Sequence, residues 1–124
     1  MTKKILAVGT SEEAAWLQTV SEAVRSLGEI TFNTMETAFS ELKSTPYDLI
    51  IIDATAIGDD MVDLVAQFHT ARPCTPILVA TTSPTWQRAR QAFQAGAADY
   101  IRKTFNQQKL LTMCRDLIDK SSKP

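Results

Sequence analysis

Asp53, Thr81 and Lys103 carry the clearest chemical signal in this sequence, because each stands at the end of a separate strand-like run. A carboxylate at a strand end can act as a nucleophile, a metal ligand or a general base. A lysine supplies charge to one phosphoryl oxygen, and a threonine hydroxyl can donate to another. The set could therefore hold a phosphoryl group on Asp53. The structural alternative is a partly buried ion pair between Asp53 and Lys103, with Thr81 only ending a strand.

These residues can meet only if the runs before them are neighbouring strands of one sheet. Five strand-like runs alternate with five helical patterns along the chain. Strict alternation predicts right-handed crossovers and a parallel sheet with helices on both faces. The predicted fold class is α/β, a flavodoxin-like doubly wound five-stranded sheet in the order 2-1-3-4-5, with ligands bound at the carboxyl ends of the strands. The predicted strands are 5–8, 29–35, 49–52, 76–81 and 99–102.

Local signals indicate where several of the predicted helices begin and end. Thr10–Glu13 has the pattern of a capping box, and Gly28 is expected to end that first helix in a left-handed conformation. Ser83–Pro84 predicts the cap and first turn of the fourth helix, which Gly96 ends. Asn106 is expected to cap the last helix.

The composition fits one globular domain and disfavours several classes of function. The chain has 124 residues, 44% hydrophobic and 22% charged, with a net charge of −1. Such a charge gives no electrostatic reason to expect direct nucleic-acid binding, and no apolar run predicts a membrane span or a signal peptide. Cys74 and Cys114 form no CxxC pattern and indicate free thiols in a cytoplasmic protein. We expect a domain at 1–120, with 121–124 a tail or the start of a linker.

Three stretches of the sequence resemble the receiver domain of bacterial two-component response regulators. The resemblance covers the chain from Lys4 to about Leu117. Its last stretch is the most specific, because it closely follows the family's pattern Gly-Ala-x-Asp-Tyr-x-x-Lys-Pro-Phe. The three stretches are 47–53, 75–82 and 95–105.

The resemblance implies a role for each residue of the candidate site. Asp53 would be the phosphoacceptor, Thr81 the hydroxyl that binds the phosphoryl group, and Lys103 the cation that contacts it. Tyr100 would be the switch that couples this site to the face formed by the fourth helix, fifth strand and fifth helix. The phosphoryl group would come from a sensor histidine kinase or a phosphotransfer protein. No enzymatic activity is implied beyond self-phosphorylation and dephosphorylation at Asp53.

The chain departs from the family where the metal site should be. The family ends its first strand with two acidic residues that bind Mg²⁺ together with the phosphoacceptor, and this chain has Gly9–Thr10 there. The family's frequent proline, glycine and proline are replaced by Ile57, Met61 and Thr104. The resemblance is therefore to an atypical receiver.

Asp53 and the backbone carbonyl of Thr55 remain as ligands, so Mg²⁺ is expected to bind weakly or not at all. Glu12–Glu13 and Asp59–Asp60 could approach a metal, but they also suit the starts of helices. Losing the metal removes several kcal/mol of charge stabilisation. A loss of about 3 to 4 kcal/mol would slow phosphorylation by roughly 100- to 1000-fold.

Four further residues suggest a partner surface. Trp86, Arg88 and Arg90 lie on the predicted fourth helix, and Arg102 lies on the neighbouring strand. Trp and Arg are enriched at interface hot spots, so this face could bind a second copy or a downstream protein. The alternative is a solvated helix with one packed aromatic residue, and Trp16 on the first helix is ambiguous in the same way.

Three hypotheses follow from these patterns. The first is a phosphorelay receiver with Asp53 as phosphoacceptor and a degraded metal site. The second is a phosphorylation-independent interaction domain, or pseudo-receiver, on the same fold. The third is a flavin or nucleotide binder that uses the turn Gly9–Ser11, although this turn lacks the usual glycine-rich patterns.

Overall fold

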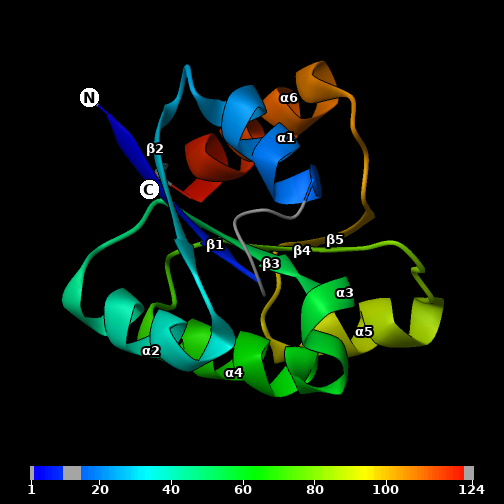
Figure 1. Ribbon diagram of the computed structural model, residues 1–124. Helices are drawn as coiled ribbons and strands as arrows, with labels where there is room; N and C mark the ends of the chain where they lie inside the picture. The colour runs from blue at the N-terminus through cyan, green and yellow to red at the C-terminus, as the bar shows by residue number, and fades with distance from the viewer. Residues whose placement is uncertain (1, 10–14, 122–124) are drawn as a thin grey trace.

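Five parallel strands form one sheet in the order β2-β1-β3-β4-β5 (Figure 1). The computed structural model describes residues 2–9 and 15–121. Both the predicted order and the predicted direction of the strands are confirmed. The strands are β1 Lys3–Val8, β2 Gly28–Asn33, β3 Leu49–Asp53, β4 Ile77–Thr81 and β5 Asp99–Arg102.

Helices cover both faces of the sheet, as predicted (Figure 1). On one face α1 (Ala15–Val24) packs against α6 (Gln107–Ser121). Three helices cover the opposite face, with α4 packed against both of its neighbours. None of the helices within residues 2–9 and 15–121 is long and apolar enough to cross a membrane. The three helices of the second face are α2 Met35–Ser44, α4 Met61–Ala71 and α5 Trp86–Ala95.

The connection from β3 to α4 contains two short elements that the sequence patterns did not predict. They are the helix α3 (Ala54–Ile57) and the 3₁₀ turn η1 (Gly58–Asp60). Because of α3, the predicted fourth and fifth helices are α5 and α6 in the structure. The short elements carry Thr55 close to the carboxyl end of β3, where its backbone reaches Asp53.

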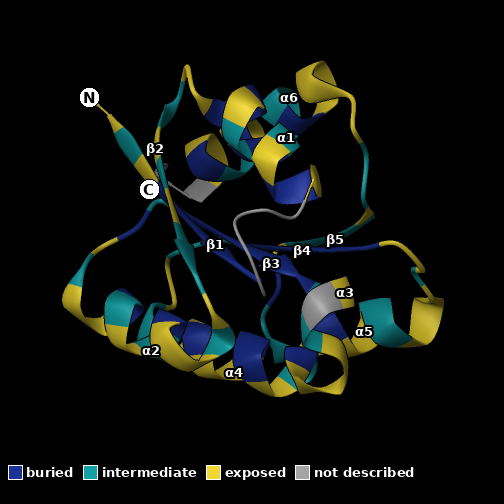
Figure 2. Cartoon of the chain, viewed as in Figure 1, coloured by how far each residue is buried: buried dark blue, intermediate teal, exposed yellow. Residues whose placement is uncertain are grey.

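Burial on both faces explains why the central strands are continuous apolar runs (Figure 2). In β3, Ile50 and Ile52 pack into the core beneath α2 and α4. Leu49 and Ile51 point to the opposite face and join the core with α1 and α6. All four side chains are fully buried, so the strand that carries Asp53 is fixed from both sides.

Strand register brings the candidate residues to one edge of the sheet. Asp53 pairs with Ala80 across β3 and β4, so Thr81 lies one residue further along the neighbouring strand. Lys103 follows β5, and its backbone N–H donates to the carbonyl of Thr81 at 2.9 Å. Three strand ends therefore present a carboxylate, a hydroxyl and an ammonium side by side.

Gly28 plays a different role from the one predicted. The helix α1 ends at Val24, and Gly28 opens β2, where it pairs with Lys3 of β1. Among the described residues, the glycines with positive φ are Gly58 and Gly96, so Gly28 is not a left-handed cap. A Cβ at Gly28 would lie 2.0 Å from the carbonyl oxygen of Lys3. A glycine is needed here because two backbones approach closely.

The helix caps agree with the sequence signals in part. Gly96, at φ 123°, ends α5 as predicted, and Asn106 caps α6 by accepting from the N–H of Lys109 at 3.0 Å. The prediction of a cap at Ser83–Pro84 is wrong. Thr85 has the required extended backbone and accepts from the N–H of Arg88 at 3.2 Å. The predicted capping box at 10–13 lies outside the described residues.

We predict that Gly28→Ala destabilises the fold by roughly 1 to 3 kcal/mol, because the new methyl group would force β2 away from β1. Urea unfolding followed by circular dichroism measures the change. Gly58→Asn is the control, since Gly58 has φ 70° and open space around its Cβ position, and asparagine tolerates this conformation. Equal unfolding midpoints for the two variants would contradict the close-approach role of Gly28.

Candidate functional site

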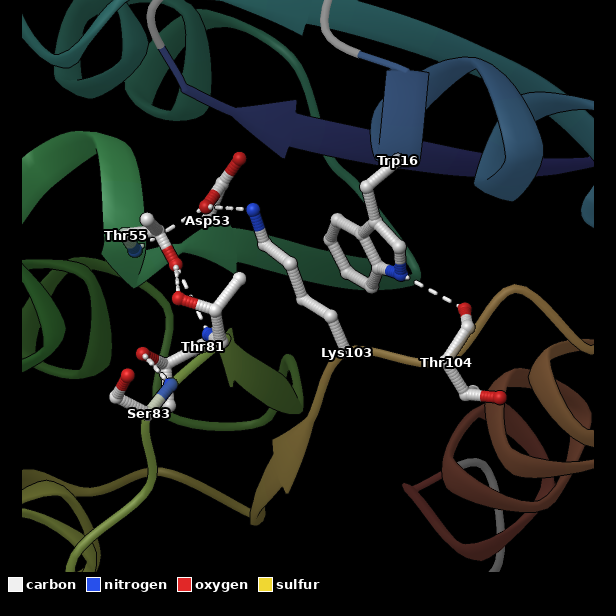
Figure 3. A network of polar contacts seen from close by, with 8 residues as sticks. Trp16, Asp53, Thr55, Thr81, Ser83, Lys103 and Thr104 are labelled. Carbon is white, nitrogen blue, oxygen red and sulfur yellow. Dashed lines mark hydrogen bonds and ion pairs between the residues drawn. The ribbon is translucent and has the colours of Figure 1, made fainter.

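Asp53 ends β3 and is only 2% exposed, so its carboxylate needs partners within the protein. Its Oδ1 atom lies 2.8 Å from the Lys103 Nζ atom and accepts a hydrogen bond from the Thr55 backbone N–H at 3.1 Å. Figure 3 shows these contacts at the end of the strand. The structure thus brings Asp53 and Lys103 into direct contact, as both the phosphoryl interpretation and the structural alternative require.

Lys103 is held from its other side by Trp16. The Nζ atom lies 5.3 Å from the centroid of the Trp16 ring, within the range of a cation–π contact. The indole Nε1–H donates to the carbonyl of Thr104 at 2.9 Å. In Figure 3 the lysine side chain passes between Asp53 and the indole. The sequence left Trp16 ambiguous, because no spacing motif marks a contact between residues so far apart in the chain.

Threonine side chains link α3, which follows β3, to the loop that follows β4. The Thr81 hydroxyl is largely buried and accepts from the N–H of Ser83 at 3.3 Å. The Thr55 hydroxyl accepts from the N–H of Thr82 at 3.0 Å and lies 3.4 Å from the Thr82 hydroxyl. Only the backbone of Thr55 was considered from sequence, and its side chain is a site residue that the sequence analysis missed. Its hydroxyl joins α3 to the loop after β4, beside Asp53.

Tyr100 and Thr81 share a small cavity of about 150 Å³. Met61, Ser83 and Arg88 also line it. Arg88 forms an ion pair with Asp59, whose side chain is 94% exposed, so the pair contributes little to stability. The cavity places the predicted switch residue next to the predicted phosphoryl-binding hydroxyl.

Of the four predicted interface residues, Arg88 is half-buried and lines the cavity beside Thr81, whereas the other three lie on the surface of α5 and β5. Trp86 is 69% exposed, and Arg90 and Arg102 are exposed as well. Phe93, which is 47% exposed, was missed from sequence. Trp86, Arg90 and Phe93 follow the spacing i, i+4, i+7, which places them on one face of α5. This spacing was a readable signal for the missed residue.

The part of the chain that the structure describes places few carboxylates near Asp53. Gly9 is buried beside Asp53, and a Cβ added to it would lie 3.4 Å from the Asp53 Cβ and 4.0 Å from its Oδ2. Glycine therefore occupies the position from which a second carboxylate would reach Asp53. No group of three His, Cys, Asp or Glu side chains that could hold a metal occurs within residues 2–9 and 15–121. Asp59 pairs with Arg88 instead, while Thr10 and Glu12–Glu13 lie outside the described residues.

Comparisons with known proteins agree with the fold and with the family resemblance. The family model described as the response regulator receiver domain matches residues 12–115. The two-component response regulator PhoP of Pseudomonas aeruginosa is 30% identical over 70% of this chain and 39% of its own length. The response regulator protein FleR of the same organism is 29% identical over 91% of this chain and 24% of its own length. The chain thus spans well under half the length of these relatives.

A solved structure has the same fold as this chain. The CheY-like response regulator receiver domain protein from Methanospirillum hungatei superimposes with a TM-score of 0.85. The alignment covers 98% of this chain and 97% of that protein, at 19% sequence identity. The likeness therefore extends over the whole sheet and its helices.

We predict that Gly9→Asp creates a Mg²⁺ site, because it adds a second carboxylate beside Asp53. The leucine at position 17 must give way slightly, since its Cδ1 atom would lie 3.0 Å from the new Cβ. Gly9→Asn is the matched control, with the same size and no charge. Mg²⁺ titration by calorimetry should show at least roughly tenfold tighter binding to the aspartate variant. Equal affinities would mean that position 9 does not reach the metal.

Proposed function

The chain belongs to the response regulator receiver domain family, and we propose that it is a cytoplasmic phosphorelay receiver that is phosphorylated slowly on Asp53. One observation carries this proposal: the Asp53 carboxylate lies 2.8 Å from the Lys103 ammonium, beside Thr81, at the carboxyl edge of the sheet. The receiver unit would be 1–120, and its donor would be a sensor histidine kinase or a phosphotransfer protein.

The residues present can support the transfer itself. A carboxylate oxygen of Asp53 would form a bond to phosphorus while the bond from phosphorus to the donor's nitrogen or oxygen breaks, which leaves an acyl phosphate. Lys103 would move its charge from the carboxylate to a phosphoryl oxygen, and the Thr81 hydroxyl would donate to another. Lys103 has to separate from Asp53 to do so. This requirement adds to the reasons for a slow reaction.

Weak metal binding is the main reason to expect slow transfer. Gly9 offers no ligand, and the site keeps one carboxylate and one ammonium. Mg²⁺ would normally share the charge of the phosphoryl oxygens. If its loss costs about 3 to 4 kcal/mol, the rate falls by roughly 100- to 1000-fold. In our proposal Mg²⁺ therefore binds this site only weakly.

A second candidate function is a phosphorylation-independent interaction domain. The burial of the ion pair favours it, because the side chains of Lys103 and Asp53 are only 12% and 4% exposed. Phosphorylation would require this buried pair to open so that a donor can reach the Asp53 carboxylate. In this case the ion pair would be a fixed part of the fold, and signalling would depend on partner contacts alone.

We propose that partners bind the α5 face, defined by Trp86, Arg90 and Phe93 together with Arg102 on β5. The α5 sequence contains Arg88 and Arg90 but no acidic residue. Arg90 and Arg102 are both exposed, so this face carries positive charge beside the exposed rings of Trp86 and Phe93. An acidic, partly apolar downstream protein fits this face. A second copy packed on the same face would bring equal charges together.

The phosphoacceptor role is tested by incubating the chain with acetyl phosphate and Mg²⁺ and measuring intact mass. We expect one phosphoryl adduct, which forms roughly 100- to 1000-fold more slowly than in a receiver with both acidic residues. Asp53→Asn is the control and should stay unmodified. If no adduct forms and Asp53→Asn remains functional in cells, the pseudo-receiver hypothesis replaces the first.

The α5 face makes a separate prediction about assembly. The chain alone should sediment as a monomer, because Arg90 would oppose its own copy in a two-fold contact. Sedimentation velocity at low and high salt measures this. A dimer that Trp86→Ser disrupts, and that Gln18→Ser on α1 leaves intact, would show instead that the face binds a second copy.

A further inference from the structure

We propose that Trp16 is a positioning residue that holds the Lys103 ammonium on Asp53 and connects this ion pair to α1. The inference rests on the proposed role of the Asp53 site. It adds Trp16, a helix residue, to the three residues at the strand ends. Trp16 lies at the start of α1 and is 3% exposed. It belongs to the core formed with α6, so its ring has a fixed place against the sheet.

Two contacts from one side chain reach two consecutive residues. The ring lies over the Lys103 Nζ atom at 5.3 Å, and the Nε1–H donates to the Thr104 carbonyl at 2.9 Å. The hydrogen bond fixes the orientation of the ring about its own axis. The ring therefore contacts the Lys103 ammonium while the indole N–H holds the backbone of the next residue, Thr104.

Lysine needs such support more than arginine would. Its ammonium is a compact and strongly hydrated charge on a flexible stem. At 12% side-chain exposure, Lys103 has lost most of its contact with water. The Asp53 carboxylate and the electron-rich face of the Trp16 ring replace that hydration from two sides. The ring therefore limits the directions in which Lys103 can leave Asp53.

Because of this arrangement, the position of the Lys103 ammonium depends on the position of α1. The hydrogen bond from Trp16 to Thr104 joins residues 88 positions apart in the sequence, one at the start of α1 and one just after β5. Since α1 also packs against α6, a partner that shifted α1 would move the ring and release or tighten the lysine. The site could then respond to contacts on α1 without a metal ion.

Lysine labelling tests the proposal without any phosphorylation. Reductive methylation of the native chain, read by peptide mass spectrometry, reports how readily the Lys103 amine leaves Asp53. Trp16→Leu removes the ring and should raise Lys103 modification by roughly 3- to 10-fold. Trp16→Phe keeps a ring but loses the N–H donor, so it should give a smaller increase. Trp86→Leu, which changes an exposed tryptophan, should behave like the unaltered chain.

Cys114 separates a positioning role from general loosening of the core. It is fully buried in the same core as Trp16, and burial raises the pKa of its thiol to about 12. Lys103 modification that rises while Cys114 stays unreactive toward a thiol reagent supports the proposal. Unchanged Lys103 modification in both Trp16 variants overturns it, as does an increase that appears only when Cys114 also reacts. If Trp16→Leu fails to fold, Trp16→Phe decides by the same criteria.

The two proposals can fail separately. If Asp53 accepts no phosphoryl group while Trp16→Leu still releases Lys103, only the proposed function is lost. If phosphorylation occurs and Lys103 labelling does not depend on Trp16, only the positioning role is lost.

Discussion

A buried carboxylate is tolerated in a protein only when a cation or several hydrogen-bond donors accompany it. Asp53, at 2% exposure, meets this condition through Lys103 and the N–H of Thr55. The sheet makes the meeting possible, because parallel strands carry both residues to the same edge. The buried apolar run of β3 fixes the position of the Asp53 backbone. The backbone hydrogen bond from the Lys103 N–H to the Thr81 carbonyl fixes the point from which the lysine side chain starts. The site therefore depends on the strand order as much as on its own residues.

Gly9 and Trp16 both bear on how this ion pair behaves. Gly9 removes a carboxylate that would compete for Lys103 or recruit a metal, and the remaining charges balance. Trp16 gives the lysine a second contact on the side opposite Asp53. In a site with more carboxylates and a metal, the cation would be shared among several oxygens. Here one carboxylate and one aromatic ring hold it, so a change at either partner acts directly on Lys103.

The sequence predicted the parts of the structure that depend on periodic patterns and on topology. Apolar runs and their alternation with helices were enough to predict the strand order and to gather Asp53, Thr81 and Lys103 at one edge. Trp16 could not be predicted as a partner of Lys103, since a cation–π contact leaves no spacing in the sequence. Gly28 looked like a helix cap because glycine serves both left-handed turns and close backbone contacts. Only the strand register distinguishes the two uses.

The charge balance of the Asp53–Lys103 pair has a consequence for how partners first meet the domain. Opposite unit charges 2.8 Å apart produce a field that decays quickly with distance, so the strand edge has little power to attract ions or proteins from solution. Arg90 on α5 and Arg102 on β5 are exposed. Charges of one sign act over roughly a Debye length, about 8 Å at physiological salt. Diffusional encounter would thus be guided by the α5 face and not by the strand edge that carries Asp53. Recognition and chemistry would then respond differently to ionic strength.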